Sequence, residues 1–405
     1  MKTLYLCYFG LREPLVQTQV LPYLHELAKD GIEVSLLTFE PAMRRNWSNE
    51  DKNEWQQRLR RGGINWHALS YHKRPSLPAT LYDIAVGSIW IVYYIFKHQI
   101  QILHARAHIP LAMALIVKIL TGRKVIFDIR GLVADEYVDA GIWQKGTPVY
   151  RVIKWLETVG IRKADQLVVL TESLKGWIVN QHGIPESKIE VIPCCVDNSK
   201  ATLAHRTEDR RVRAGEELEI IYAGSVTGLY LFDEMIRFFL VLKKRWPQAF
   251  FRVLTGSAND QVKQKLYDSG LTDRDFWVGF VAPSDLPQFL SRAKVGLSFR
   301  KPTFSQIAAS PTKVPEYLAF GIPVVANAGI GDTDQLLREN NVGVIIDEFS
   351  PEAYAAAVKK LEDLLKDGSI KNRCQEIAKR FFDLVRVGGA RYLSVYQKAC
   401  PENMR

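Results

Sequence analysis

The chain has 405 residues, of which 47% are hydrophobic and 24% charged, and its formal net charge is +10. This length and composition predict a globular protein of two or three domains. The positive charge favours an anionic partner, such as nucleotide phosphates or a lipid surface. The sequence lacks zinc-finger and RNA-recognition spacings, which argues against a nucleic-acid partner.

Compartment signals are consistent with the cytoplasm. The most apolar stretch, Leu81 to Phe96, covers 16 residues and is short for a membrane span, and the N-terminus shows no signal-peptide pattern. We therefore expect a cytoplasmic protein, either free or peripheral on the inner face of the membrane. Scattered cysteines without regular spacing argue against a disulfide framework or a metal site; they are Cys7, Cys194, Cys195, Cys374 and Cys400.

The first elements expected along the chain form a βαβ unit. Thr3 to Phe9 is a continuous apolar run, which is typical of a strand buried on both faces of a parallel sheet. Val16 to Asp30 is amphipathic and predicts a helix, and Ile32 to Thr38 predicts the next strand. Gln17 and Thr18 stand at the helix start, where they would offer polar groups to an acceptor near the preceding loop.

Positions 44 to 74 are rich in Arg and Lys, with Trp47, Trp55, Trp66 and Tyr71 interleaved. One interpretation is a surface that meets anionic lipid headgroups or an anionic glycan. The alternative is a solvated helix face with some tryptophans in the core. The sequence leaves both open.

Two further strands are predicted at Ile102 to Ala105 and Lys124 to Asp128, separated by a helix over Ile109 to Leu120. Asp128 and Arg130 follow the second strand. Ligands of doubly wound sheets bind at the carboxyl ends of strands, so these two residues are candidate catalytic groups. The alternative is an internal Asp–Arg pair that pins the loop.

The second half of the chain repeats this pattern after a polar stretch from Asn198 to Glu217, which reads as a linker. Strands are predicted over 218–223, 250–255, 276–280 and 295–299, and helices over 351–365 and 377–398. Polar or flexible residues follow two of these strands and are candidate ligand contacts: Gly224, Ser225, Arg300 and Lys301.

Positions 310 to 327 combine a phosphate-type and a diol-type signal. Ser310 precedes Pro311 and reads as a helix cap, with the helix starting at Pro311 or at Pro315. Either start leaves free N–H groups beside Thr312 and Lys313, which suits a phosphate. Glu316 stands about one turn further, where its carboxylate could accept hydrogen bonds from two vicinal hydroxyls, as in a ribose. Together these features suggest a nucleotide.

Asn327 opens a loop whose glycines, Gly329 and Gly331, could cradle an anion. Asp332 and Asp334 follow with one residue between them, as in metal-dependent transferases. Their position is wrong for that role, and we interpret them as a helix cap. No metal site is predicted.

The stretch from 310 to 327 resembles the donor motif of retaining glycosyltransferases of family four, which have the GT-B fold. Glu316 matches the second Glu of that motif, and Gly321, Pro323, Val324 and Val325 match its tail. The passage from Ile184 to Asp197 also resembles the family's domain crossing. The resemblance implies two Rossmann-like, doubly wound parallel-sheet domains facing across a cleft: an acceptor domain at 1–197, a linker at 198–217, a donor domain at 218–376, and a crossover helix at 377–405.

The chain departs from the family pattern at several positions. Ala308 stands where the first Glu is expected, and Pro14 and Leu15 replace a glycine pair. Ser225 replaces an Arg, and positions 226–231 lack the usual Lys. We expect Arg300 and Lys301, together with Lys313, to replace the missing cations at the donor diphosphate.

The resemblance implies transfer of a sugar from a nucleotide-sugar donor to a glycan or lipid-linked acceptor, with retention and without a metal or other cofactor. An anionic membrane surface is a further expected partner. Two alternatives remain open: a non-catalytic partner subunit of a glycan-assembly complex, and a nucleotide-sugar epimerase. Donor hydrolysis in vitro would separate a transferase from a binding subunit.

Overall fold

The computed structural model describes residues 1–72, 74–199, 218–256 and 259–401. The chain divides into two compact units, each described here by itself. Unit 1 contains Met1–Asp135, Gln144–Pro193 and the segment from Leu384, and unit 2 contains Glu136–Trp143 and Cys194–Asp383. Most of the linker predicted at 198–217 lies outside the described residues.

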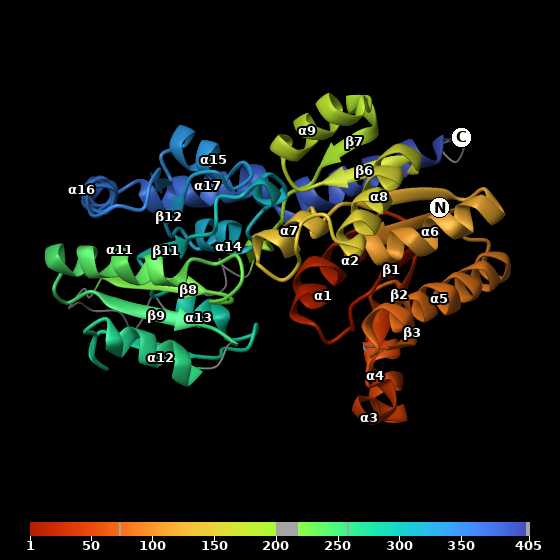
Figure 1. The fold of residues 1–405 in the computed structure, drawn as a ribbon, viewed down its shortest axis with the longest axis horizontal. Helices are drawn as coiled ribbons and strands as arrows, with labels where there is room; N and C mark the ends of the chain where they lie inside the picture. Colours follow the sequence, from red (N-terminus) through yellow and green to blue (C-terminus); the bar gives the residue numbers. More distant parts are fainter. Residues whose placement is uncertain (73, 200–217, 257–258, 402–405) are drawn as a thin grey trace. The chain divides into compact units, whose positions relative to one another are not determined.

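Unit 1 is built on a parallel seven-stranded sheet with the order β3-β2-β1-β4-β5-β6-β7 (Figure 1). Strands β1, β2, β4 and β5 are apolar runs buried on both faces, as expected for a parallel sheet covered by helices, whereas the edge strand β3 is partly exposed. The strands are β1 (Lys2–Cys7), β2 (Glu33–Pro41), β3 (Ile64–Tyr71), β4 (Ile102–Arg106), β5 (Lys124–Asp128), β6 (Gln166–Val169) and β7 (Ile189–Val191).

Helices cover both faces of this sheet. Each connection between parallel strands is a right-handed crossover. A helix therefore lies on one face when the next strand is added at one edge of the sheet, and on the other face when it is added at the opposite edge. One face carries α5 (Ser76–His98), α6 (His108–Thr121) and α8 (Pro148–Lys163), with α6 in contact with both others. The other carries α2 (Leu21–Lys29) and α18 (Ala390–Ala399). The remaining helical elements are α1 (Pro14–Gln19), α3 (Met43–Asn46), α4 (Asn49–Arg61), α9 (Glu172–His182), η1 (Glu186–Lys188) and η3 (Leu384–Gly389). Helix α7 (Val133–Asp139) begins in unit 1, and its residues from Glu136 onward belong to unit 2.

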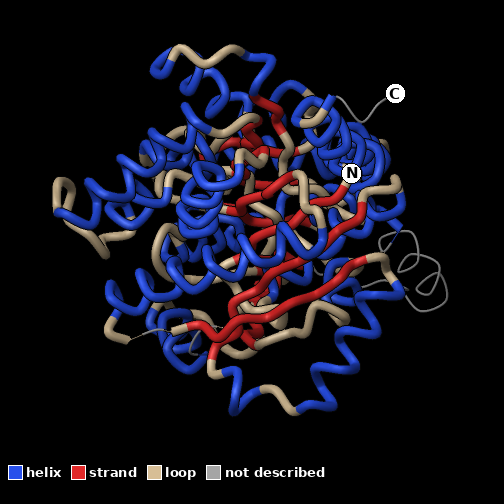
Figure 2. The backbone as a smooth tube through the Cα atoms, turned by 90° about the vertical axis from the view of Figure 1, so that its right-hand side faces the viewer, coloured by secondary structure: helices blue, strands red, loops and turns tan. Residues whose placement is uncertain are grey.

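Unit 2 repeats the architecture with a parallel six-stranded sheet of order β10-β9-β8-β11-β12-β13. Figure 2, coloured by secondary structure, shows strands flanked by helices in the chain as a whole. The strands are β8 (Glu219–Ala223), β9 (Phe250–Leu254), β10 (Phe276–Gly279), β11 (Val295–Ser298), β12 (Val324–Asn327) and β13 (Gly343–Ile346). The helical elements are α11 (Phe232–Arg245), α12 (Asn259–Asp268), α13 (Leu286–Leu290), η2 (Phe304–Ala308), α14 (Lys313–Ala319), α15 (Thr333–Glu339), α16 (Pro351–Lys366) and α17 (Ile370–Phe382). The fold predicted from the sequence, two doubly wound parallel-sheet domains, is confirmed.

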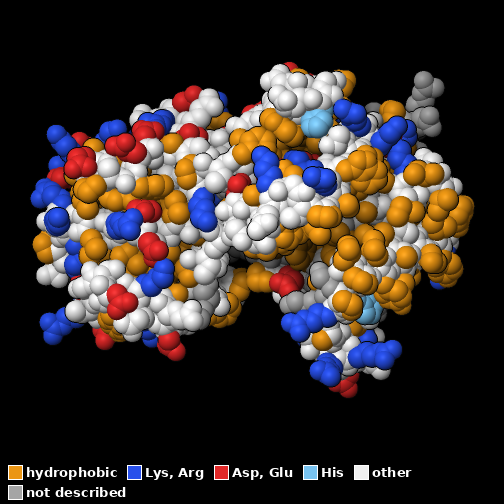
Figure 3. Space-filling view, viewed as in Figure 1, with side chains coloured by type: hydrophobic (Ala, Val, Ile, Leu, Met, Phe, Trp, Pro, Cys, Tyr) orange, Lys and Arg blue, Asp and Glu red, His pale blue; other side chains and the backbone are white. Residues whose placement is uncertain are grey.

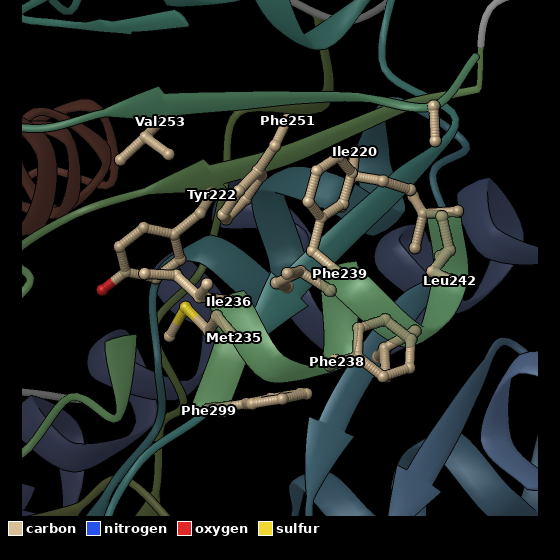
Figure 4. Packing of buried hydrophobic residues seen from close by; sticks show 14 of the residues in the cluster. Ile220, Tyr222, Met235, Ile236, Phe238, Phe239, Leu242, Phe251, Val253 and Phe299 are labelled. Carbon is tan, nitrogen blue, oxygen red and sulfur yellow. The ribbon is translucent and has the colours of Figure 1, made fainter. Parts of the chain in front are cut away.

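The core of unit 2 shows why the strand ends are held firmly. Aromatic rings from α11 pack onto β8, β9 and the end of β11, with Phe238, Phe239, Phe251 and Phe299 all fully buried (Figure 4). Tyr222 belongs to the same cluster but turns its hydroxyl toward the carboxyl end of the sheet. Burial of such rings stabilises each by about 1.5–3 kcal/mol. The strand ends are therefore rigid supports for the loops that follow them.

The C-terminal crossover begins later than predicted. Ile377 lies inside α17, where it is buried in the core of unit 2 with Cys374 and Phe382. The chain joins unit 1 only from Leu384 onward. There α18 inserts Tyr392 and Tyr396, both almost fully buried, against the sheet. The last helix belongs to the first domain, as expected, but the segment that returns to this domain starts at Leu384 and not at Ile377.

One predicted helix differs in extent, and the most apolar stretch lies inside a longer helix. The helix expected over Val16 to Asp30 is broken at Val20, because Pro22 lacks an N–H and disfavours helical geometry just before it. The apolar stretch expected at 81–96 is the centre of α5, a much longer helix. Residues Leu77–His98 of α5 are long and apolar enough to cross a membrane by length and composition, with 39% of the tested window buried.

The basic segment at 44–74 resolves into α3, α4 and β3. Trp47 and Trp66 are buried with their ring centroids 5.0 Å apart, so they belong to the core. Arg58, Arg60 and Arg61 are exposed on α4. This arrangement agrees with the alternative of a solvated helix face beside core tryptophans.

Candidate functional site

The predicted donor residues gather at one edge of the unit 2 sheet. Strands β8, β11 and β12 are neighbours and parallel, so the loops that follow them leave from the same edge. Gly224 and Ser225 follow β8, Arg300 and Lys301 follow β11, and the loop after Asn327 follows β12. Helix α14 starts at this edge too, because its Tyr317 hydroxyl accepts a hydrogen bond of 3.0 Å from the Ala223 N–H.

Lys313 is the centre of this cluster. Its side chain is only 4% exposed, and its Nζ lies 4.4 Å from the ring centroid of Tyr222 and 4.3 Å from that of Tyr230. The Tyr222 hydroxyl lies 3.4 Å from Nζ. Within the described residues, Lys313 forms no ion pair with a carboxylate. The cation is thus held by aromatic faces, which attract it through their quadrupoles.

The charge on Lys313 is costly in the unliganded protein. Burial lowers the pKa of Lys313 well below its usual value, and the nearby Arg300 lowers it further, against a smaller opposing effect of Glu316. Gly224 makes the close approach possible, because a Cβ there would lie 3.1 Å from Nζ and its φ of +146° disfavours other residues. An anion placed beside Nζ would offset the cost of burying this cation.

Arg300 shares the ring of Tyr230 with Lys313. Its guanidinium carbon lies 4.8 Å from the Tyr230 centroid, and its Nε donates a 2.7 Å hydrogen bond to Oε1 of the fully buried Gln306. The ring of Tyr230 therefore contacts two cations, Arg300 and Lys313. The sequence analysis missed Tyr230 and Gln306, because their roles depend on contacts across the fold; the isolated β-bridge between Tyr230 and Arg300 is what joins the two loops.

Three residues predicted to contact the donor have internal partners. Asn327 accepts from the Arg300 N–H at 2.8 Å and donates to the Ala328 carbonyl, so it orients the loop after β11. The Gly331 N–H donates to the Gln306 carbonyl at 2.8 Å. The Gly329 N–H donates to Asp334 Oδ2 at 3.4 Å. These groups shape the loops, and the anion cradle expected there has its N–H groups engaged by the protein.

The cap predicted at Ser310 is wrong. Its Oγ accepts a 3.1 Å hydrogen bond from the Cys194 N–H, and α14 begins at Lys313, between the two starts considered. Thr312 takes the N-cap position without a side-chain cap hydrogen bond. Glu316 lies in the first turn and is partly exposed, as a diol acceptor requires. Asp332 takes the N-cap position of α15, where a cap was predicted, although its side chain makes no cap hydrogen bond.

Lys301 and Ser225 lie at the margin of the cluster. The Lys301 Nζ donates to the Asp139 carbonyl at 3.4 Å, within unit 2. Ser225 is exposed, and its Oγ accepts from the Thr227 N–H at 3.3 Å. The Tyr222 hydroxyl donates to the Ser225 carbonyl in a short hydrogen bond. Ser225 therefore anchors Tyr222, one wall of the Lys313 cage.

Asp128 in unit 1 is the centre of a second charged cluster. Its side chain is fully buried, accepts a 2.9 Å hydrogen bond from the Tyr392 hydroxyl, and lies 3.6 Å from both Arg106 Nη1 and Arg130 Nη1. Burial alone would raise the pKa of Asp128, but Arg130, His104 and Arg106 hold it below its usual value. This is the internal Asp–Arg arrangement considered as an alternative. Arg130 is partly exposed at the strand end, so it is the better placed of the two to contact a substrate.

The first loop of unit 1 is held by a residue that the sequence did not reveal. Glu40 is 1% exposed, and its carboxylate accepts from the Leu11 N–H at 2.8 Å and from Trp47 Nε1 at 3.1 Å. Gly10 passes so close that a Cβ there would lie 2.9 Å from Glu40 Oε2. The two polar residues expected to face an acceptor, Gln17 and Thr18, donate to the backbone carbonyls of Leu11 and Pro14.

Comparison with known proteins follows the division of the chain. A family model described as Glycosyltransferase Family 4 matches residues 16–200, and one described as Glycosyl transferases group 1 matches residues 205–381. A D-inositol 3-phosphate glycosyltransferase of Paenarthrobacter aurescens is 25% identical over 208 residues, which span 49% of this chain and 49% of that protein. The match thus covers about half the length of this relative.

Two solved structures share the fold over nearly the whole chain. Sucrose-phosphate synthase of Thermosynechococcus elongatus superposes with a TM-score of 0.73 at 14% identity, covering 100% of both chains. Anabaena HepE in complex with UDP-glucose gives a TM-score of 0.67 at 16% identity, covering 98% of this chain and 100% of HepE. At these identities the likeness concerns the fold.

Proposed function

Since the chain belongs to the glycosyltransferases of family four with the GT-B fold, we propose that it transfers a hexose from a nucleotide-sugar donor to a hydroxyl of a glycan or lipid-linked acceptor. The observation that carries the donor assignment is the buried Lys313 in its cage of tyrosine rings. A nucleoside diphosphate would supply a negatively charged partner for this cation. HepE, whose fold is similar, binds UDP-glucose.

In the proposed reaction the bond from the anomeric carbon to the diphosphate oxygen breaks, and the diphosphate leaves with the electron pair. The acceptor oxygen then bonds to the same face of the anomeric carbon, which gives retention. A diphosphate oxygen takes the acceptor proton. Lys313 and Arg300 stabilise the charge that develops on the leaving diphosphate, because they are preorganised at one sheet edge before the substrate arrives.

We propose that this chemistry proceeds without a metal. Lys313 and Arg300 would stabilise the leaving diphosphate in place of a metal ion. Within the described residues no group of three or more His, Cys, Asp or Glu is placed to hold a metal ion. Glu316 would accept the ribose hydroxyls from the first turn of α14. Arg130 in unit 1 would contact the acceptor or the transferred sugar, with Asp128 acting as its positioning residue through the 3.6 Å ion pair.

The first experiment separates this reaction from the two alternatives. The protein is incubated with UDP-, GDP- and ADP-sugars, and free nucleotide and the sugar product are measured. A transferase releases nucleotide slowly by hydrolysis in the absence of an acceptor. A partner subunit binds without release, and an epimerase converts the sugar while the nucleotide stays attached. Absence of binding to every nucleotide would reject the proposal.

A second experiment tests the Glu316 assignment on the ligand itself. Wild type and Glu316→Gln are titrated with the preferred nucleoside diphosphate and with its 2′,3′-dideoxy analogue. Wild type should prefer the natural ribose by about fivefold, a hydrogen-bond contribution of about 1 kcal/mol. The variant should lose this preference, whereas Glu352→Gln on the exposed surface of α16 should keep it. Equal discrimination by all three proteins would reject the ribose contact.

A further inference from the structure

We propose that the outer face of α5, α6 and α8 in unit 1 docks in the plane of an anionic lipid bilayer. Hydrophobic side chains gather over α5 and α6 at the right-hand side of Figure 3. We call these three outer faces the apolar face. Contiguous exposed apolar surface of this kind marks an interaction site in a folded protein. This inference does not depend on which reaction the chain catalyses.

Helix α5 contributes a continuous stripe. Leu77, Leu81, Ile89 and Tyr93 recur at multiples of four residues, and their exposures run from 57% to 72%. Phe96 extends the stripe by one turn with 68% of its surface exposed. Residues four apart share one helix face. Each step of four residues turns by about 40°, so the exposed side chains form a band that winds slowly along most of the helix.

Helices α6 and α8 extend the face sideways. Ile116, Ile119 and Leu120 of α6 are exposed, with Ile119 at 85%. On α8 the exposed residues Val149, Val152 and Trp155 recur every three residues. Because α6 contacts both α5 and α8, the three stripes form one layer over the sheet. An exposed Trp beside aliphatic residues is typical of segments that lie at a membrane interface.

The inner side of α5 shows that the helix lies flat on its own sheet. Ile91 and Ile95 are fully buried, and the Tyr94 hydroxyl bonds Ser35 Oγ at 3.0 Å and His67 Nε2 at 2.8 Å. To cross a bilayer, α5 would have to leave these contacts. We therefore expect α5 to stay packed on unit 1 and to insert only its outer side chains at the membrane–water interface.

Charge selects an anionic bilayer as the occupant. Between positions 77 and 163, all of which are described, no Asp or Glu is exposed, whereas six Lys or Arg are. The three helices end just before β4, β5 and β6, so their carboxyl ends meet at one edge of the sheet. That edge carries exposed Lys97, Lys124, Arg162 and Lys163. Lipid phosphates attract such cations over about a Debye length.

The same charge pattern disfavours a second copy of this chain as the occupant. A two-fold dimer would bring the same surface of both subunits together. The basic rim of each subunit would then meet a surface that offers no exposed acidic residue from positions 77–163 to compensate it. The half-buried Asp165 is already shared by Lys118 and Lys124.

Flotation of the full chain with vesicles tests the proposal. Wild type should float with vesicles of phosphatidylcholine and phosphatidylglycerol, and far less with phosphatidylcholine alone. The double variant Ile119→Asp/Leu120→Asp should lower the partition coefficient at least about tenfold, because it removes two inserting side chains. Val385→Asp is the matched control: it changes a 56% exposed apolar residue of η3, which packs against α2 on the other side of the sheet.

Two further arms decide between surfaces and occupants. Lys124→Glu/Lys163→Glu should reduce binding to anionic vesicles, whereas replacing Arg58, Arg60 and Arg61 of α4 by Ala should leave it unchanged. The proposal fails if wild type binds no vesicles, or if the Ile119→Asp/Leu120→Asp variant binds like wild type. It also fails if sedimentation shows a wild-type dimer that this variant converts to a monomer, since a second copy would then cover the face.

Discussion

Two clusters of charge stand at the carboxyl ends of parallel strands, one in each unit, and they differ in how their charge is satisfied. In unit 1, Asp128 is surrounded by Arg106, Arg130 and His104, and the Tyr392 hydroxyl donates a hydrogen bond to it. In unit 2, Lys313 and Arg300 share the ring of Tyr230 and have hydroxyl and amide partners, respectively. The buried Asp128 carboxylate thus has opposite charges within the protein. The second cluster leaves positive charge for a ligand to neutralise.

This difference teaches how a strand-end cluster can be interpreted. Position at the carboxyl edge is shared by both and does not separate a structural cluster from a binding site. Burial does not separate them either, since Asp128 and Lys313 are both almost fully buried. What separates them is whether the buried charge has an opposite charge within the protein, because an unpaired buried charge is costly unless a ligand completes it.

The largest effect is expected from removing the centre of the unit 1 cluster. Asp128→Ala leaves the buried Arg106 and the partly exposed Arg130 without their carboxylate, and should lower the free energy of unfolding by about 3–5 kcal/mol. Urea unfolding measures this change. Asp260→Ala, at an exposed position of α12, should stay within about 0.5 kcal/mol of wild type. A loss below about 1 kcal/mol for Asp128→Ala would show that the cluster is not needed for stability.

Removing the centre of the unit 2 cluster should have opposite effects on stability and binding. Lys313→Met keeps the length of the side chain and abolishes a buried charge, so the melting temperature should not fall. Affinity for the nucleoside diphosphate should drop about 30-fold, roughly 2 kcal/mol for a charged hydrogen bond. Calorimetry measures the melting temperature and the diphosphate affinity of Lys313→Met, with Lys359→Met on the exposed surface of α16 as the control. Parallel loss of stability and affinity would make Lys313 a structural residue.

Proton uptake sharpens the same contrast. The pKa of Lys313 is depressed in the free protein, and a bound diphosphate raises it, so binding takes up a proton at a pH between the two values. Within that window affinity should fall as pH rises, by up to about tenfold per pH unit or 1.4 kcal/mol. Calorimetry in buffers of different ionisation enthalpy counts the protons. Identical uptake by Lys313→Met would assign the titration to another group.

The smallest effect is expected at the ring that both cations share. Tyr230→Leu keeps an apolar side chain and removes the quadrupole, so binding of the diphosphate should weaken about threefold to fivefold, or 0.5–1 kcal/mol. Combined with Arg300→Ala, the losses should not add, because the ring positions the guanidinium. A double-mutant cycle measures this coupling. Strict additivity would mean that the two residues act independently.

The sequence was sufficient for the elements whose signal is local. Continuous apolar runs predicted β1 and β5, and the polar residues after β11 pointed to Arg300. The break at Val20 could also have been predicted, since Pro22 disfavours helix just before it. The motif beginning at Ser310 identified α14 and Lys313, although it left two possible starts for the helix, Pro311 and Pro315.

Other features depend on contacts between distant parts of the chain. The Tyr230 cage joins loops some 70 positions apart, and the Tyr392 hydroxyl reaches Asp128 from 264 positions away. The apolar face has a different cause. Helix α5 is apolar on nearly every side, so its composition does not tell which side covers the sheet and which remains exposed. That distinction requires the packing of Tyr94 and Ile95.

The insertion of unit 2 between two parts of unit 1 sets an order of folding during synthesis. The segment from Leu384 supplies Tyr396, whose hydroxyl contacts Thr3 Oγ1 at 3.3 Å and His104 Nδ1 at 2.8 Å. The ribosome makes this segment after Cys194–Asp383, so unit 2 can fold while the core of unit 1 still lacks two tyrosines. The sheet of unit 1 is translated first and completed last, and a nascent chain stalled before Tyr392 should expose it to proteases and chaperones.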